Sequence, residues 1–261
     1  MKKSIHIALP RVVAALLSFL FWIGVWWCVA AVFDKPLLLP TPPAVLRTLC
    51  SLAATARFWG TIALSLLRIL SGIALALLCG CLLAWLTAKS RACHHLFSPL
   101  LAFFKATPVA SVIFLVLLWV GRARVPTLIA FVMALPIVWS NVREGLLQTD
   151  RQLLEMAQVF GITARKKLTL IHIPSLFPYF LSACRSAISL AWKAGIAAEV
   201  LALPKSSIGR AIYDGKMYLL TNELFAWTLT VVLISALIEW GTLTLLKKAQ
   251  NAKWQGVSKH A

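Results

Sequence analysis

Acidic residues are scarce in this chain, which has eight Asp and Glu among 261 residues against 26 Lys and Arg. Charged residues of both signs make up only 13% of the sequence, whereas about 25% is usual for soluble domains. A soluble domain of this size needs a charged surface, but side chains that face lipid can be apolar. The composition therefore excludes an ordinary soluble domain and predicts a membrane protein.

The sequence also lacks the groups of residues that form enzyme active sites, metal sites and nucleotide sites. The carboxylates form no paired site, the six cysteines are scattered without a two-residue-spaced pair, and His94 and His95 are adjacent, so they face different sides of a helix. No Lys before a Ser or Thr follows a glycine-rich phosphate loop. We expect no catalytic residue, metal or cofactor in this chain.

The basic excess, a net charge of +18, does not indicate a nucleic-acid partner. The charges lie in short clusters between long apolar runs, which is how membrane proteins mark their cytoplasmic loops. No basic stripe alternates with aromatic residues on a soluble module. The expected surrounding is a lipid bilayer, and no nucleic acid is expected.

Apolar runs close to the 20 residues that cross a bilayer predict an all-α protein with six transmembrane helices in one domain, residues 1–261. The first run is too long for the apolar core of a signal peptide, so we predict an uncleaved helix. The third run is short for a helix that faces lipid. The predicted spans are residues 12–33, 61–87, 108–120, 125–141, 178–203 and 225–246.

The distribution of basic residues predicts the orientation. With the N-terminus in the cytoplasm, inner segments contain 15 of the 26 Lys and Arg residues. Both termini are then cytoplasmic, and so is the long polar loop 142–177. Loops 34–60 and 204–224 are then periplasmic or extracellular.

The inner loop contains a motif with a recognisable spacing. Glu155, Met156 and Ala157 are followed by Gly161, and then by a hydrophobic-proline element at Ile171, Ile173 and Pro174. We expect a short helix that ends at Gly161, where a left-handed cap favours glycine, and a second helix that ends before Pro174. Such a compact surface element could dock in a groove of a soluble partner. Short motifs also arise by chance in an ordinary loop between two spans.

This motif resembles the EAA loop of permeases from binding-protein-dependent ABC importers, with Met156 where that family usually has Ala. The run LLEMAQVFGITARKKLTLIHIPSLFPYFLSACRSAISLAWKAGIAAEVLA and the following SIGRAIYDGKMYLLTNELFAW look like the sulfonate, taurine, nitrate and bicarbonate branch. The resemblance covers nearly the whole chain. It implies the type I ABC importer permease fold in a bacterial inner membrane. It also implies a homodimer, two separate ATPase subunits that bind ATP and Mg²⁺, and an extracytoplasmic substrate-binding protein.

The fifth predicted span carries charge on one helical face. Arg185, Ser189 and Lys193 recur every four residues, and charges inside a span are costly unless they face a partner helix or an aqueous path. Two cations with hydroxyls would suit an anion. Alternatively, Arg185 stays near the cytoplasmic end and pairs with a loop carboxylate, while Lys193 either snorkels or meets Glu199 near the outer end.

Glu199 matches a glutamate of the family near the outer end of its helix, so a gating role is a second interpretation. Arg68 and Glu239 are isolated charges in or beside spans, for which cross-helix pairing or anchoring at a helix end is the simpler account.

The predicted substrate is a small anion such as a sulfonate, taurine, nitrate or bicarbonate. A small heterocyclic vitamin or pyrimidine precursor is an alternative. An ion-coupled secondary transporter is a further one, but it would usually show internal repeats and a buried acidic residue for the ion.

Overall fold

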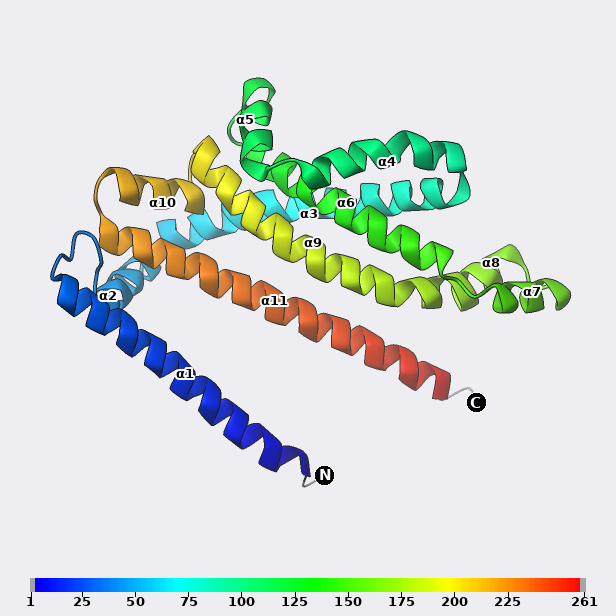
Figure 1. The fold of residues 1–261 in the computed structure, drawn as a ribbon, viewed down its shortest axis with the longest axis horizontal. Helices are drawn as coiled ribbons and strands as arrows, with labels where there is room; N and C mark the ends of the chain where they lie inside the picture. Colours follow the sequence, from blue (N-terminus) through cyan, green and yellow to red (C-terminus); the bar gives the residue numbers. More distant parts are fainter. Residues whose placement is uncertain (1–2, 259–261) are drawn as a thin grey trace. The chain divides into compact units, whose positions relative to one another are not determined.

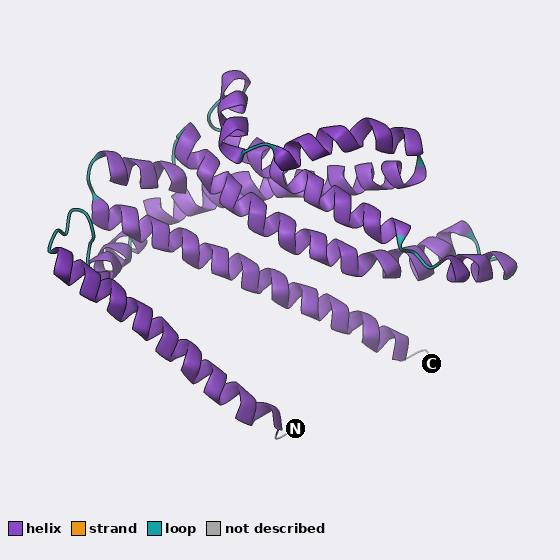
Figure 2. Ribbon diagram, viewed as in Figure 1, coloured by secondary structure: helices purple, strands orange, loops and turns teal. Residues whose placement is uncertain are grey.

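The computed structural model describes residues 3–258, and every regular element within that range is a helix (Figure 2). The chain divides into two compact units. One comprises residues 1–60 and 211–230, and the other comprises residues 61–210 and 231–261. The all-α prediction is therefore confirmed for the described part of the chain.

The smaller unit holds α1 (Lys3–Phe33), α2 (Pro42–Ala53), most of α10 (Ile208–Met217) and the first turns of α11 (Thr221–Ser258). Prolines at the first two positions of α2 fix the start of that helix, because a first-turn residue needs no N–H partner. The Thr221 hydroxyl donates to the Leu37 carbonyl oxygen at 2.6 Å. This bond joins the start of α11 to the segment that follows α1.

The larger unit contains the remaining helices, with α3 from residue 61 onward, together with the start of α10 and the rest of α11. Figure 1 labels these helices. These helices are α3 (Ala56–Lys89), α4 (Arg91–Ala106), α5 (Val109–Trp119), α6 (Val125–Leu147), α7 (Arg151–Val159), α8 (Ala164–Lys167) and α9 (Ile173–Ala202). A short π-helix, Leu168–His172, leads directly into α9.

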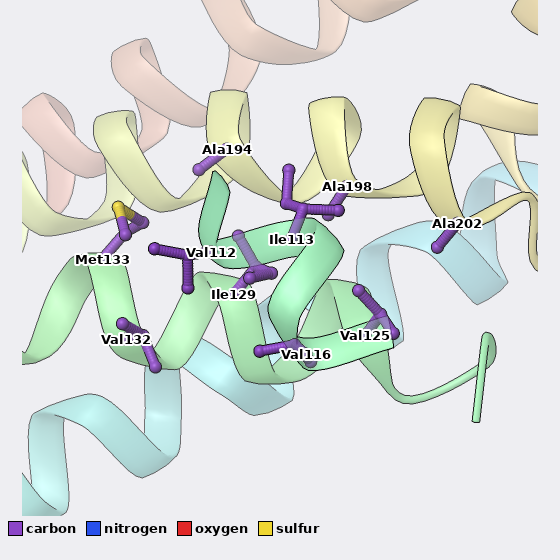
Figure 3. Close-up of a cluster of buried hydrophobic side chains, with 10 residues drawn as sticks. All are labelled: Val112, Ile113, Val116, Val125, Ile129, Val132, Met133, Ala194, Ala198 and Ala202. Atoms are coloured by element: carbon purple, nitrogen blue, oxygen red, sulfur yellow. The ribbon is translucent and has the colours of Figure 1, made fainter. Parts of the chain in front are cut away.

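The core of this unit lies where α5, α6 and α9 meet. Figure 3 shows branched side chains of α5 and α6 facing small residues of α9. Ala194, Ala198 and Ala202 recur every four residues, so one face of α9 is smooth enough for close approach. On α3, a Cβ at Gly72 would overlap the carbonyl oxygen of Thr127 in α6. Small residues thus determine how closely these helices pack.

Four helices are long and apolar enough to cross a membrane, by length and composition of the described residues. The bent pair of α4 and α5 makes a fifth if it counts as one span. These candidates are Leu16–Phe33, Ala56–Lys89, Val125–Leu147 and Thr221–Thr244, with Arg91–Ala106 and Val109–Trp119 as the bent pair. The 30-residue α9 is not among them, since it carries Arg185, Lys193 and Glu199. The predicted number of six spans is not confirmed.

The predicted span at 108–120 is wrong as a separate crossing. It is the 11-residue helix α5, only about 17 Å long, and α4 meets it at an angle of 109°. Pro108 causes the break, because a proline disfavours helical backbone at the preceding residue. Thr107 accordingly has the extended φ of −78° and ψ of 131°.

Candidate coupling helix and buried charged sites

Helix α7 is held at both ends by local hydrogen bonds. The Asp150 side chain accepts the Gln152 N–H at 2.8 Å, which satisfies one free donor of the first turn. At the other end Gly161 has a φ of +61°, its N–H donates to the Gln158 carbonyl, and the Ile162 N–H donates to the Ala157 carbonyl. This pattern is a Schellman motif, which needs a left-handed residue after the helix. The predicted helix end at Gly161 is confirmed.

One face of α7 is apolar and exposed. Leu153, Met156 and Phe160 lie at positions i, i+3 and i+7, and all three are exposed. Ala157, by contrast, is only 2% exposed, and Glu155 is exposed on another side of the helix. An apolar helical face with few neighbours of its own is suited to binding a groove in another protein.

The two other residues predicted for this loop, Ile171 and Pro174, do not lie on α7. Ile171 belongs to the π-helix, and Pro174 lies in the first turn of α9. The prediction that a second helix ends before Pro174 is wrong, because proline is tolerated in the first turn and marks a helix start here. Figure 1 shows α7 and α8 beyond the C-terminal end of α6 and the beginning of α9.

Arg185, Ser189 and Lys193 line one cavity of about 300 Å³ between α9 and α11. Three polar residues of α11 line the same cavity, namely Ser235, Glu239 and Thr242. A guanidinium nitrogen of Arg185 lies 3.9 Å from a carboxylate oxygen of Glu239, and both side chains are 56% exposed. The predicted face on α9 therefore meets a polar face on α11, and the partner of Arg185 is not a loop carboxylate.

Glu199 is not part of that cavity. It is fully buried, and its carboxylate accepts from the Ser65 hydroxyl at 2.8 Å and from the Gly209 N–H at 3.1 Å. Arg68 lies 3.6 Å from its other oxygen. The alternative that Lys193 pairs with Glu199 is wrong, because α9 turns Glu199 toward α3 instead.

Arg68 extends this buried network to the segment after α9. Its guanidinium donates to the carbonyl oxygens of Lys205 and Ser206 at 2.9 and 3.1 Å. The Ser65 hydroxyl also accepts the Ile208 N–H at 3.0 Å. A Cβ at Gly209 would overlap Glu199, so only glycine permits this approach. The predicted cross-helix pairing is confirmed for Arg68, which pairs with Glu199, and for Glu239, which pairs with Arg185.

Reasoning from the sequence named Arg68 and Glu239 but missed Ser65 of α3 and Ser235 and Thr242 of α11, which complete these two sites. Ser235, Glu239 and Thr242 recur at i, i+4 and i+7, the same polar periodicity that identified the face on α9. That signal was available in the sequence. The contribution of Ser65 was not, because a lone serine in an apolar run has no pattern.

The helix arrangement resembles a solved transporter structure. A chain of a crystal structure described as an amino acid ABC transporter with histidines superimposes with a TM-score of 0.60. The match covers 75% of this chain and 93% of the other, at 16% sequence identity. The likeness shows that the two chains share a fold.

The chain belongs to the family of binding-protein-dependent transport system inner membrane components, whose profile matches residues 72–243. The taurine transport system permease protein TauC of Escherichia coli (strain K12) is 24% identical over 240 residues, which cover 89% of this chain and 86% of TauC. The formylaminopyrimidine transport permease protein ThiX of Halalkalibacterium halodurans is 29% identical over 196 residues, or 73% of this chain and 74% of ThiX. The protein is thus a multi-pass inner-membrane permease subunit of an ABC importer.

Proposed function

We propose that this permease imports a small anion, driven by ATP that separate subunits hydrolyse. In this proposal a homodimer of the chain associates with two ATPase subunits, which bind ATP and Mg²⁺, and with an extracytoplasmic binding protein. Membership in a binding-protein-dependent family supports the two kinds of partner. The described chain supplies no cluster of carboxylates, histidines or cysteines that could hold a metal.

Helix α7 is the proposed contact with the ATPase. Its exposed apolar face, formed by Leu153, Met156 and Phe160, is the part of the 142–177 loop best suited to a groove. The Schellman motif at Gly161 fixes the C-terminal end of α7, so that α7 is a short helix with a defined end. Movement of the ATPases would then be transmitted to α9, which begins only a few residues after α8.

The anion assignment is carried by one observation, the cavity between α9 and α11. Arg185 and Lys193 place two positive charges beside the hydroxyl of Ser189. Charged side chains in a membrane helix cost free energy, so their presence here indicates a function. We propose that these residues line the translocation path. The relative TauC, named for taurine transport, supports a sulfonate among the possible anions.

Glu199 has a different proposed role, which is to position residues 204–210, the first part of the outer loop 204–224. Its bonds reach Ser65 and Gly209, and Arg68 continues them to the carbonyl oxygens of Lys205 and Ser206. The loop would face the binding protein if the N-terminus is cytoplasmic. A buried carboxylate would thus fix the docking surface.

Import of a heterocyclic precursor is the second candidate, since the relative ThiX is named for formylaminopyrimidine transport. Proteoliposomes that contain the permease, its ATPase and its binding protein separate the two. We expect ATP-dependent uptake of a radiolabelled alkanesulfonate, nitrate or bicarbonate, and no uptake of formylaminopyrimidine. The opposite preference would contradict the anion assignment.

A charge variant links the uptake to the cavity. Lys193→Met is expected to lower anion uptake about tenfold or more, because a positive charge in a low-dielectric path stabilises an anion strongly. Arg91→Met removes the same kind of charge from the exposed start of α4, away from the cavity, and should leave uptake within about twofold. Unchanged uptake by Lys193→Met would remove the path assignment.

A further inference from the structure

Two cross-helix ion pairs among the described residues differ in how firmly they are held. Arg68 and Glu199 are 18% and 0% exposed, and backbone groups and Ser65 hold them in place. Arg185 and Glu239 are each 56% exposed and lie 3.9 Å apart. An exposed ion pair at this distance is weak and exchanges its partners readily. The first pair is suited to a structural role, and the second to exchange.

The cavity around the loose pair has more donors than acceptors. Arg185 and Lys193 are cations, Ser189 and Ser235 provide hydroxyls, and Glu239 is the one carboxylate among its described lining residues. The Thr242 hydroxyl already donates to the Ile238 carbonyl oxygen at 2.6 Å. Lys193 makes no ion pair with a described carboxylate. The formal charge of the group is therefore +1 with Glu239 present. One added negative charge would neutralise it.

A buried donor at the same cavity has no acceptor. Trp192 lines the cavity, is 1% exposed, and its indole Nε1–H lacks a hydrogen-bond partner among the described residues. Buried indole N–H groups usually find a partner, because an unpaired donor costs free energy. An oxyanion that reached this nitrogen would supply the missing acceptor. This donor is independent of the two cations.

The pair lies toward one end of the apolar part of each helix. Glu239 is five residues before Thr244, where the apolar segment of α11 ends, and Arg185 is 17 residues before the end of α9. Charges at such positions are stabilised by one another or by water in a cavity. The cavity of about 300 Å³ has room for a small organic or inorganic oxyanion.

We propose that the cavity between α9 and α11 binds a monovalent oxyanion, and that the Glu239 carboxylate occupies the place of this anion beside Arg185 until the anion arrives. The substrate then binds Arg185 in place of Glu239, with Lys193 and the hydroxyls as further partners, and the Glu239 carboxylate moves away from Arg185. The exchange transfers no proton and neither forms nor breaks a covalent bond. This inference rests on the proposed function, because it specifies the substrate class and the competitor at the same path.

The exchange predicts opposite effects for the two partners of one ion pair. Removing the Glu239 charge frees Arg185 and leaves the cavity more positive, so anions should enter more readily. Removing the Arg185 charge leaves Glu239 to repel them. If the pair were only structural, both changes would act in the same direction.

Thiol labelling measures this difference without requiring transport. Ser189→Cys, in a background without the six native cysteines, is labelled in the purified permease–ATPase complex. The reagents are sulfonatoethyl methanethiosulfonate, which is itself a sulfonate, and its trimethylammonium analogue of similar size. We expect the anionic reagent to react about tenfold faster than the cationic one, because a positive cavity concentrates anions. Ethanesulfonate should slow the anionic reaction.

Variants at the pair then decide the proposal. Combined with Ser189→Cys, Glu239→Gln should raise the rate of the anionic reaction at position 189 roughly threefold to tenfold, and Arg185→Gln should lower it by a similar factor. Arg185→Lys keeps the charge and should retain the rate, which covers the case that Arg185→Gln does not fold. Ser111→Cys, on the exposed surface of α5, is the control and should react equally with both reagents in every variant.

Equal rates for the two reagents at position 189, or changes of the same sign for Glu239→Gln and Arg185→Gln, would overturn the exchange. If the ATPase still copurifies and ATP-driven uptake persists in that case, the proposed function stands and only this inference fails. If no ATPase associates with the chain, the proposed function fails. Labelling of the chain alone then still decides whether the cavity prefers anions.

Discussion

The double variant Met156→Asp/Phe160→Asp is expected to lose ATP-driven uptake and to copurify with about 30-fold less ATPase, or less still, while the permease remains folded. Both side chains are exposed, so the substitutions remove no buried packing within the chain. They place two carboxylates on the face that we assign to the ATPase groove, and central apolar anchors commonly contribute about 2 kcal/mol or more each to binding. Affinity pull-down of the ATPase measures the loss, and size-exclusion chromatography monitors the fold.

The matched control is Gln158→Asp, which adds a carboxylate to the opposite side of the same helix. Its side chain is exposed and does not share the face of Leu153, Met156 and Phe160. We expect it to retain the ATPase and most of the uptake. Normal uptake by the double variant would show that this face of α7 is not the coupling surface.

Glu199→Ala is expected to destabilise the permease by roughly 3 to 5 kcal/mol, because removing one partner of a buried ion pair leaves the other charge uncompensated. Arg68 is only 18% exposed and would lose its carboxylate, while the Gly209 N–H and the Ser65 hydroxyl would lose their acceptor. The melting temperature of the purified protein in nanodiscs should fall by about 6 °C or more.

Glu239→Ala is the comparison, since it removes the same side chain from the exposed pair with Arg185. Its cost should stay below about 1 kcal/mol, the usual range for exposed ion pairs. Glu199→Gln should fall between the two, because an amide oxygen still accepts from Ser65 and Gly209. Equal melting temperatures for the two alanine variants would show that burial of Glu199 adds nothing to stability.

Features determined by local sequence could be predicted. The end of α7 follows from Gly161, where a left-handed backbone is needed, and the face of Arg185, Ser189 and Lys193 follows from a period of four residues. The family resemblance seen in the Glu155 to Pro174 motif agrees with the profile match over residues 72–243.

Features determined by tertiary contacts could not be predicted. The two carboxylates Glu199 and Glu239 have partners more than 50 residues away, and nothing local to Arg68 or Arg185 indicates which helix will face it. The break at Pro108 was visible as a proline, but the 109° bend that it makes depends on how α5 packs against α6 and α9. Pro174 was misread because proline is compatible with both the end and the start of a helix.

The proposed coupling requires that α7 lies in the cytoplasm and touches a separate ATPase. A photo-cross-linking amino acid at position 160, irradiated in intact cells, tests this requirement most directly. We expect a cross-linked product that contains the permease and the ATPase, and no such product from position 158. Absence of the ATPase from the product at position 160, or labelling of that position by a membrane-impermeant reagent added outside the inner membrane, would show that α7 is not the contact with the ATPase.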